Sequence, residues 1–283
     1  MTAAFIVVAV WSETFITSKI LLNNGLMPAD IFFYRFSLAY FLIWFISPKR
    51  LFAFSVKDEL LMLLLGITGG SLYFLSENTA LNYSTASNVA IIVCSAPILT
   101  AILLSAFYQD ERMNLKQVLG SAIAFAGVVL IIYNGEVVLQ LNPKGDVLAL
   151  AAAVTWGLYS LMMKNLTPKY STRFITRKVF GYGLLTILPY FLVHPLCTDM
   201  EVLSIPVVWG SLAYLGVVAS MVCFVVWNTC LRVIGTVRTT NLIYCQPFFT
   251  MLFAYSVLGD RITWMAVIGT AVLTTGMILA AEK

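Results

Sequence analysis

The sequence predicts an all-α integral membrane protein with ten transmembrane helices. Three observations predict this fold: the composition, a series of long apolar segments, and an internal repeat. Of the 283 residues, 60% are hydrophobic and 11% are charged, and the mean hydropathy is +0.92. Soluble globular chains carry roughly 25% charged residues. This composition therefore excludes a soluble enzyme, a nucleic-acid-binding protein and a disordered chain.

Ten apolar segments are long enough to cross a bilayer, which takes about 20 residues for a helix. We expect helices because every backbone polar group in hydrocarbon needs an internal partner, and because the period-two alternation of a β-barrel is absent. Most of the segments contain no Asp, Glu, Lys or Arg, and the first three contain isolated charges. The expected spans are residues 2–22, 29–47, 58–80, 84–109, 117–135, 147–163, 179–198, 202–231, 239–259 and 262–281.

The distribution of Lys and Arg predicts that both termini lie in the cytoplasm, because cytoplasmic loops of membrane proteins are enriched in these residues. In this orientation eleven of them lie in cytoplasmic loops and the C-terminal tail, whereas only Lys144 and Arg261 lie in outer loops. We expect a multi-pass protein of the cell membrane, which in a bacterium is the cytoplasmic membrane.

No pattern in the chain indicates a metal, a cofactor or a nucleic acid. The five cysteines lack metal-ligand spacing and there is one histidine, His194. No phosphate-binding loop and no cluster of Lys and Arg occurs. We therefore expect no cofactor and no nucleic-acid partner.

The second half of the chain repeats the first. At an offset of 150 residues, Gly66 aligns with Gly216, Asn78 with Asn228 and Pro97 with Pro247, and at 145 Trp11 aligns with Trp156. We place the two repeats at residues 1–135 and 145–283, with five spans each. Because five is odd, the second repeat enters the membrane from the opposite side. Inverted repeats of this kind are typical of secondary transporters, which expose a site near the midplane alternately to each side.

Several local motifs resemble one transporter family. They are V-W-S-E-T-F-I-T-S-K in the first span, N-T-A-L-N-Y-S-T-A-S at the end of the third, and Asp110-Glu111-Arg112 before the fifth. The second half carries A-A-A-V-T-W-G-L-Y-S and L-G-D-R-I-T-W. The whole chain thus resembles the EamA-like branch of the drug/metabolite transporter superfamily. This resemblance implies the ten-helix fold and the export of amino acids, other metabolites or toxic compounds, in some members against protons.

Charged residues inside the spans are the first candidates for the transport site. Glu13 lies near the bilayer centre, where a charge costs about 2.5–3.5 kcal/mol. We expect it to bind a cation or a coupling proton, and Thr17 shares its helix face. Arg35 and Glu77 lie in the same outer half of the membrane. We expect a small network in which Arg35 pairs with Glu77 or with Glu13, although Arg35 could instead extend to the headgroups and Glu13 could be structural.

Polar and helix-breaking residues in the spans form the second group. Asn78 and Asn228 suit hydrogen bonds between helices. Pro97 and Pro247 should kink equivalent helices, and matched interruptions point to a transporter's binding site. Residues on the span of Pro247 would then line the pathway, namely Asn241, Tyr244 and Gln246.

Aromatic residues form the third group. Trp156, Tyr159 and Trp227 lie in spans that also carry polar residues. Aromatic walls suit organic solutes and hold ammonium groups by cation–π contact. For these residues, as for the polar ones, ordinary helix packing is the alternative.

Together these features predict a secondary transporter and not an enzyme. The expected substrate is a small polar or amphipathic organic solute, such as an amino acid or a cationic drug, moved outward and with Glu13 as the candidate for proton coupling. A nucleotide-sugar or phosphate-ester antiporter is the alternative, but it needs several cations at mid-depth. A channel or an intramembrane enzyme remains the alternative from another class, although the nucleophile–base pair and the metal site that such an enzyme uses are missing. Besides the solute, we expect the lipid bilayer and coupling protons as partners, and a monomer or a weak dimer.

Overall fold

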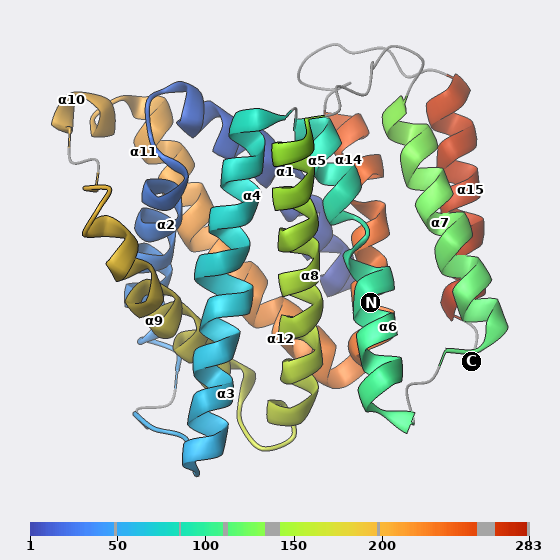
Figure 1. Ribbon diagram of the computed structural model, residues 1–283, viewed down its shortest axis with the longest axis horizontal. Helices are drawn as coiled ribbons and strands as arrows, with labels where there is room; N and C mark the ends of the chain where they lie inside the picture. The colour runs from blue at the N-terminus through green and yellow to red at the C-terminus, as the bar shows by residue number, and fades with distance from the viewer. Residues whose placement is uncertain are drawn as a thin grey trace.

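The protein is a bundle of helices that run between two ends (Figure 1). The structure, a computed structural model, describes residues 1–47, 50–84, 86–109, 113–133, 142–196, 199–253 and 264–281. All regular elements in these ranges are helical. They are α1 (Thr2–Asn23), α2 (Pro28–Ile43), α3 (Val56–Gly66), η1 (Ile67–Ser71), α4 (Leu72–Tyr83), α5 (Ala86–Val93), α6 (Ala96–Phe107), α7 (Leu115–Tyr133), α8 (Pro143–Leu166), α9 (Thr172–Phe191), α10 (Met200–Leu203), α11 (Pro206–Ala213), η3 (Tyr214–Val222), α12 (Cys223–Ile234), α13 (Thr236–Thr240), η4 (Asn241–Cys245), α14 (Gln246–Phe253) and α15 (Trp264–Ala281).

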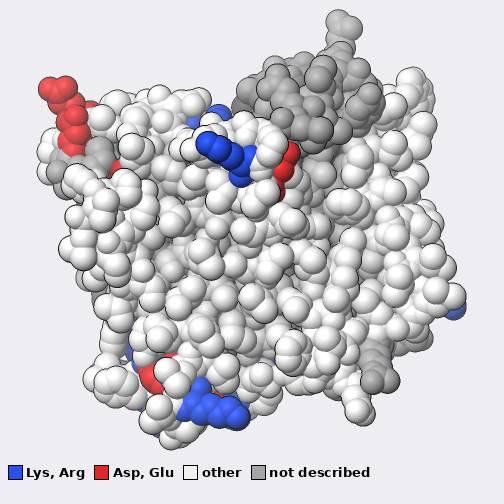
Figure 2. All heavy atoms as spheres, in the orientation of Figure 1, with Lys and Arg blue, Asp and Glu red and all other residues white. Residues whose placement is uncertain are grey.

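The outer surface of the bundle suits a lipid environment. In the described part of the chain, five helical stretches are long and apolar enough to cross a membrane: Thr2–Asn23, Val56–Tyr83, Val89–Phe107, Pro143–Leu166 and Pro206–Ile234. Large apolar side chains such as Phe41, Ile102 and Leu185 are exposed. Figure 2 shows most of the charged side chains near the upper and lower edges of one face, with a broad and largely uncharged band between them. Because water-soluble proteins rarely expose so much contiguous apolar surface, we assign this band to the membrane.

Two long stretches change helix type at matching places in the two halves. A π-helical segment, Ile67–Ser71, joins α3 to α4, and a second one, Tyr214–Val222, joins α11 to α12. Gly69 permits the first of these to touch another helix, because a Cβ there would lie 2.2 Å from the ring of Tyr159. Short π-helical segments are frequent at functional sites, and both lie beside the cavity described below.

Pro97 and Pro247 each occupy the second position of a helix. Pro97 follows the first residue of α6, just after α5 has ended, and Pro247 follows the first residue of α14. Proline is tolerated in the first turn because the missing N–H has no partner in the helix there. These prolines thus lie where one helical segment ends and the next begins.

The helix α9 begins earlier than the span expected at 179–198. Two basic residues in its first half account for the difference, because both find partners in distant parts of the chain. Arg177 donates to the carbonyl of Arg50 and lies 4.2 Å from the ring of Trp44. Lys178 forms an ion pair with Glu59 of α3. A search for charge-free windows misses such residues because it cannot see their partners.

Glycines bring the backbones of α7 and α15 into direct contact. A Cβ on Gly120 would lie 2.4 Å from the nitrogen of Ala280, and one on Gly276 would lie 2.2 Å from the nitrogen of Ala124. A Cβ on Gly127 would approach the nitrogen of Leu273 to 2.3 Å. Small residues allow helices in membranes to approach in this way.

Replacing Gly127 by valine should destabilise the protein, because the new side chain has no space between the two backbones. Overpacking of this kind costs about 1–3 kcal/mol, which corresponds to a fall in Tm of roughly 2–10 °C. Thermal unfolding of the purified protein in detergent measures the change. Gly210→Val is the matched control, since nothing lies within 4 Å of a Cβ at Gly210 of α11. Equal falls in the two variants would contradict the proposed close contact.

Candidate functional site

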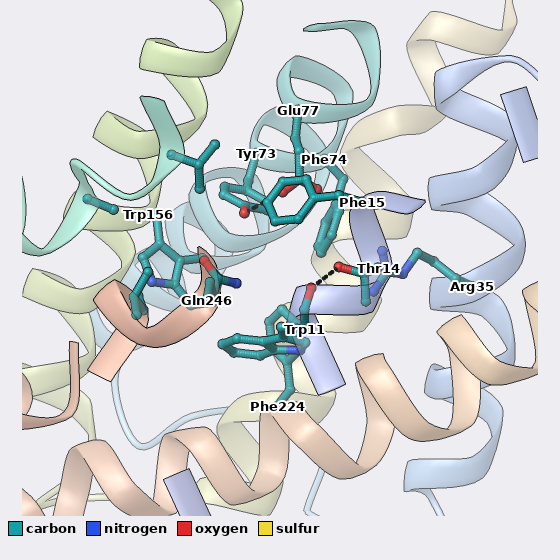
Figure 3. A pocket seen from close by; sticks show the side chains of 13 residues that line it. Trp11, Thr14, Phe15, Arg35, Tyr73, Phe74, Glu77, Trp156, Phe224 and Gln246 are labelled. Carbon is teal, nitrogen blue, oxygen red and sulfur yellow. Dashed lines mark hydrogen bonds between the residues drawn. The ribbon is translucent and has the colours of Figure 1, made fainter. Parts of the chain in front are cut away.

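A small central cavity of about 30 Å³ lies between helices from both halves of the chain (Figure 3). Helices α1, α2 and α4 supply one part of its wall, and α8, α12 and α14 supply the other. Six aromatic side chains line it: Trp11, Phe15, Tyr73, Phe74, Trp156 and Phe224. Four polar or charged side chains also face it: Thr14, Arg35, Glu77 and Gln246.

The aromatic wall is built around Trp11 of α1. Its ring lies 5.5 Å from Trp156 and 5.8 Å from Phe224, both edge to face. The indole nitrogen of Trp11 donates to the carbonyl of Ala219 at 2.9 Å, in the π-helical segment η3. This bond fixes α1 against the interrupted helix of the other half. The indole N–H of Trp156 has no partner among the described residues, so a donor remains available at the cavity wall.

Arg35 extends from α2 into the cavity and is only 1% exposed. Its Nε donates to the hydroxyl of Ser220 at 2.9 Å, and its guanidinium lies 4.3 Å from the ring centre of Phe74. These two contacts orient the side chain. The terminal amino groups of Arg35 make no hydrogen bond within the described part of the chain. A fork of this geometry matches a carboxylate or a phosphate group.

Glu77 faces the cavity from α4 and is 5% exposed. Its Oε1 accepts a hydrogen bond of 2.7 Å from the hydroxyl of Tyr73, one helical turn earlier. Within the described residues, neither Glu77 nor Glu13 lies within 4.0 Å of Arg35 as an ion pair. Arg35 thus forms no direct ion pair with either carboxyl group in this structure, although it is close enough to Glu77 for the two charges to interact. Ser220 and Tyr73 hold the two groups apart, so that both face the cavity.

Glu13 lies beside the cavity and does not line it. The hydroxyl of Tyr214, in η3, is 3.0 Å from the Oε2 of Glu13 and 3.0 Å from the carbonyl oxygen of Val10. This hydroxyl has one hydrogen and two acceptors within reach. A protonated Glu13 can donate to Tyr214 while Tyr214 donates to Val10, whereas an ionised Glu13 competes for the single hydrogen. Thr17 bonds to the backbone carbonyl of Glu13 at 3.1 Å and not to its carboxyl group.

Asn228 joins three helices away from the cavity. Its Oδ1 accepts from the hydroxyl of Tyr159 on α8 at 2.7 Å, and its Nδ2 donates to Thr176 on α9 at 2.9 Å. Its repeat counterpart, Asn78, makes one contact of 3.3 Å to the carbonyl of Pro28, and its Oδ1 has no partner among the described residues. Asn228 and Tyr159 thus act in helix packing in this structure.

Replacing Asn228 by leucine should therefore cost more stability than the same change at Asn78. The first change leaves the buried hydroxyl of Tyr159 without its partner, at about 1–3 kcal/mol, and also removes the bond to Thr176, whose hydroxyl keeps its bond to the carbonyl of Thr172. The second removes one weak hydrogen bond. Unfolding of the two variants in detergent provides the comparison, with each variant serving as the other's control. A larger loss in Asn78→Leu would contradict this assignment.

The remaining predicted residues lie at different distances from the cavity. Gln246 lines it, and Cys94 approaches its side-chain oxygen at 3.9 Å. Trp227 is fully buried behind the wall, 5.0 Å from Trp11. Tyr244 is also fully buried, and Asn241 lines a separate groove.

Sequence reasoning missed most of the aromatic wall. Trp11 could have been found, because it is the repeat counterpart of Trp156. Tyr73 could also have been found, since it precedes Glu77 by one helical turn. No sequence signal distinguishes Phe74 or Phe224 from the many other apolar residues. Among the described residues, no group of three or more His, Cys, Asp or Glu side chains is arranged to hold a metal ion.

Comparison with known proteins identifies the family. The sequence profile of the EamA-like transporter family matches residues 1–133 and 143–281. The chain belongs to the EamA-like transporter family. The family resemblance expected from the motifs is thereby confirmed, and the protein is a multi-pass membrane transporter and not an enzyme.

Relatives of this EamA-like transporter come from bacteria and archaea. An uncharacterized transporter of Archaeoglobus fulgidus is 28% identical, over 97% of this chain and 94% of its own. A probable amino-acid metabolite efflux pump of Escherichia coli is 29% identical, over 98% and 92%. A probable terminal-alkyne amino-acid exporter of Streptantibioticus cattleyicolor is 27% identical, over 80% and 74%. One solved crystal structure shares the fold, with a TM-score of 0.76 and 19% identity over 99% of this chain and 95% of that one.

Proposed function

We propose that this EamA-like transporter exports a small amino-acid-like solute through the central cavity. The observation that carries the proposal is the arrangement of Arg35 and Glu77. Both are buried, both face the cavity, and they do not neutralise each other through an ion pair. A zwitterion supplies the two missing partners, with its carboxylate on the fork of Arg35 and its ammonium group at Glu77. The faces of Trp11 and Trp156 add cation–π and apolar contacts for the rest of the solute.

The names of two relatives support the same class of solute. The Escherichia coli protein is named for amino-acid metabolites and the Streptantibioticus cattleyicolor protein for terminal-alkyne amino acids. A phosphate ester or nucleotide sugar fits less well, because the cavity offers one guanidinium and also a carboxyl group.

We infer that the chain crosses the cytoplasmic membrane ten times, as inverted repeats at residues 1–135 and 145–283 with both termini in the cytoplasm. The matched π-helical segments Ile67–Ser71 and Tyr214–Val222 support two related halves. So do the equivalent positions of Pro97 and Pro247 in α6 and α14. Alternating access then requires the two halves to move about the cavity that both of them line.

We further infer that Glu13 carries the coupling proton. Protonation changes its hydrogen bond with Tyr214, and Tyr214 belongs to the interrupted helix that also holds Trp11 through Ala219. A change at Glu13 therefore acts on the contact between α1 and η3, next to the cavity. It thereby shifts the balance between the outward-open and the inward-open states of the transporter.

Counterflow in proteoliposomes tests the class of solute. We would load the vesicles with phenylalanine and compare uptake of labelled phenylalanine in competition with N-acetylphenylalanine, phenethylamine and glucose 6-phosphate. The proposal expects competition by unlabelled phenylalanine and weak competition by the two analogues that lack either the ammonium group or the carboxylate. If glucose 6-phosphate were the only compound to compete, the amino-acid-like solute would be wrong and the phosphate-ester alternative would be favoured.

A further inference from the structure

A second opening lies between α1, the run α13–η4–α14, and α15, and it shares no lining residue with the central cavity. Its volume is about 370 Å³. Its walls are largely apolar and include Phe5, Phe248, Phe249, Leu273, Met277 and Ile278. We call it the α13–α15 groove.

Two polar side chains in this groove lack partners. Arg238 is exposed and forms no ion pair or hydrogen bond with any described residue. Asn241 is only 6% exposed, and its side-chain amide likewise has no hydrogen-bond partner in the part of the chain that the structure describes. Both side chains are therefore available to bond to a ligand that carries a polar group.

The order of groups along the groove indicates the chemistry of that ligand. Arg238, Asn241 and Phe248 follow one another along the continuous run α13–η4–α14. At a rise of about 1.5–2 Å per residue, Asn241 lies roughly 5 Å beyond Arg238, and Phe248 lies roughly 15–20 Å beyond it. A cation, then a hydrogen-bond donor, then an apolar wall is the complement of a phospholipid, which presents a phosphate, then ester carbonyls, then acyl chains.

We propose that the α13–α15 groove binds one anionic phospholipid. Arg238 binds the phosphate group, and the amide of Asn241 donates to an ester carbonyl. One acyl chain lies along Phe248 and Met277. Basic pockets between membrane helices bind anionic headgroups in this manner. The proposal is independent of the solute that the central cavity carries.

Native mass spectrometry of the full-length protein tests the headgroup contact. The protein is mixed with phosphatidylglycerol or with phosphatidylcholine at equal concentration, and the bound lipid is counted for wild type, Arg238→Gln and Arg232→Gln. Arg232 is the matched control, because it is also exposed and near the same end of the bundle but does not line the groove. One basic residue near anionic lipid contributes about 1 kcal/mol, which corresponds to about fivefold in affinity. We expect about fivefold less phosphatidylglycerol on Arg238→Gln and wild-type binding on Arg232→Gln.

Two results would overturn this assignment. Equal losses in the two arginine variants would mean that the lipid responds only to overall surface charge. Wild-type binding by Arg238→Gln would place the lipid elsewhere on the bundle.

Thr274→Trp tests the position of the acyl chain. Thr274 lines the groove from α15, and its hydroxyl bonds to the carbonyl of Thr270 in its own helix. An indole at this position fills the groove, so binding of both phospholipids should fall while Tm stays within a few degrees of wild type. Equal displacement of phosphatidylglycerol by oleate would indicate a free fatty acid instead. If the wild-type protein were a dimer and Arg238→Gln a monomer, the groove would be occupied by a second copy of the chain. Either result would refute the proposal that the groove binds a phospholipid.

Discussion

Transport of phenylalanine should fall at least 100-fold when Arg35 is replaced by glutamine. Each charge-assisted hydrogen bond to a carboxylate contributes about 1.5–3 kcal/mol. Loss of a bidentate pair therefore costs about 3–6 kcal/mol, which corresponds to a factor of 100 or more. Ser220 and Phe74 hold the guanidinium in place before the solute arrives, so the wild-type site loses little entropy on binding. Counterflow rates in proteoliposomes, at matched protein content, measure the effect.

Two further variants separate the loss of charge from the loss of geometry. Arg35→Lys keeps the charge but not the planar fork, and should transport at a rate between those of wild type and Arg35→Gln. Glu77→Gln should weaken inhibition by phenylalanine and leave the weak inhibition by N-acetylphenylalanine unchanged, because that analogue has no ammonium group. Wild-type KM in a folded Arg35→Gln protein would rule out Arg35 as the carboxylate site.

Accumulation driven by a pH gradient should disappear when Glu13 is replaced by glutamine, while counterflow of phenylalanine continues. Glutamine cannot exchange a proton, so the gradient no longer biases the two open states, whereas Arg35 and Glu77 still bind the solute. The measurement is the ratio of internal to external phenylalanine at steady state, with and without an imposed gradient. For wild type we expect a ratio that responds to the gradient. For the variant we expect a ratio of about one under either condition, since exchange without a driving force only equilibrates the solute.

Glu13→Asp and Tyr214→Phe serve as controls for this prediction. Glu13→Asp retains a titratable group and should regain part of the accumulation. Tyr214→Phe removes the hydroxyl that bonds to Glu13 at 3.0 Å, and should weaken the response to pH without abolishing counterflow. Full accumulation by the Glu13→Gln protein would assign proton coupling to another residue, or show that the carrier is driven otherwise.

The helical membrane architecture could be predicted because it depends on the hydropathy and charge of whole segments, and not on single contacts. A long segment without charged residues indicates a helix in lipid whatever its neighbours are. The alignment of Pro97 with Pro247 is likewise visible in the sequence, because the two halves match at a constant offset. The start of α9 could not be predicted in the same way. Its basic residues Arg177 and Lys178 are tolerated there because of a backbone carbonyl and an acidic side chain distant in the sequence.

The details of the cavity depended on single side-chain contacts and were harder to predict. Opposite charges in adjacent spans suggested an ion pair, but Ser220 and Tyr73 hold Arg35 and Glu77 separately. Ser220 lies 185 residues from Arg35, and no local pattern indicates that contact. Asn228 shows the same limit, because its position in a span was evident whereas its two partners were not.

The glycine contacts between α7 and α15 determine which parts of the bundle can move. Side chains that interdigitate can change rotamer and let one helix slide past another, but at Gly120, Gly127 and Gly276 backbone meets backbone. The two helices should therefore travel as one rigid body. Any change in their position relative to the rest of the protein must then take place where they contact α5, η4 and α14, which includes the side of α15 that lines the α13–α15 groove. A phospholipid in the groove would lie at this boundary, so the lipid composition of the membrane would affect how the pair moves.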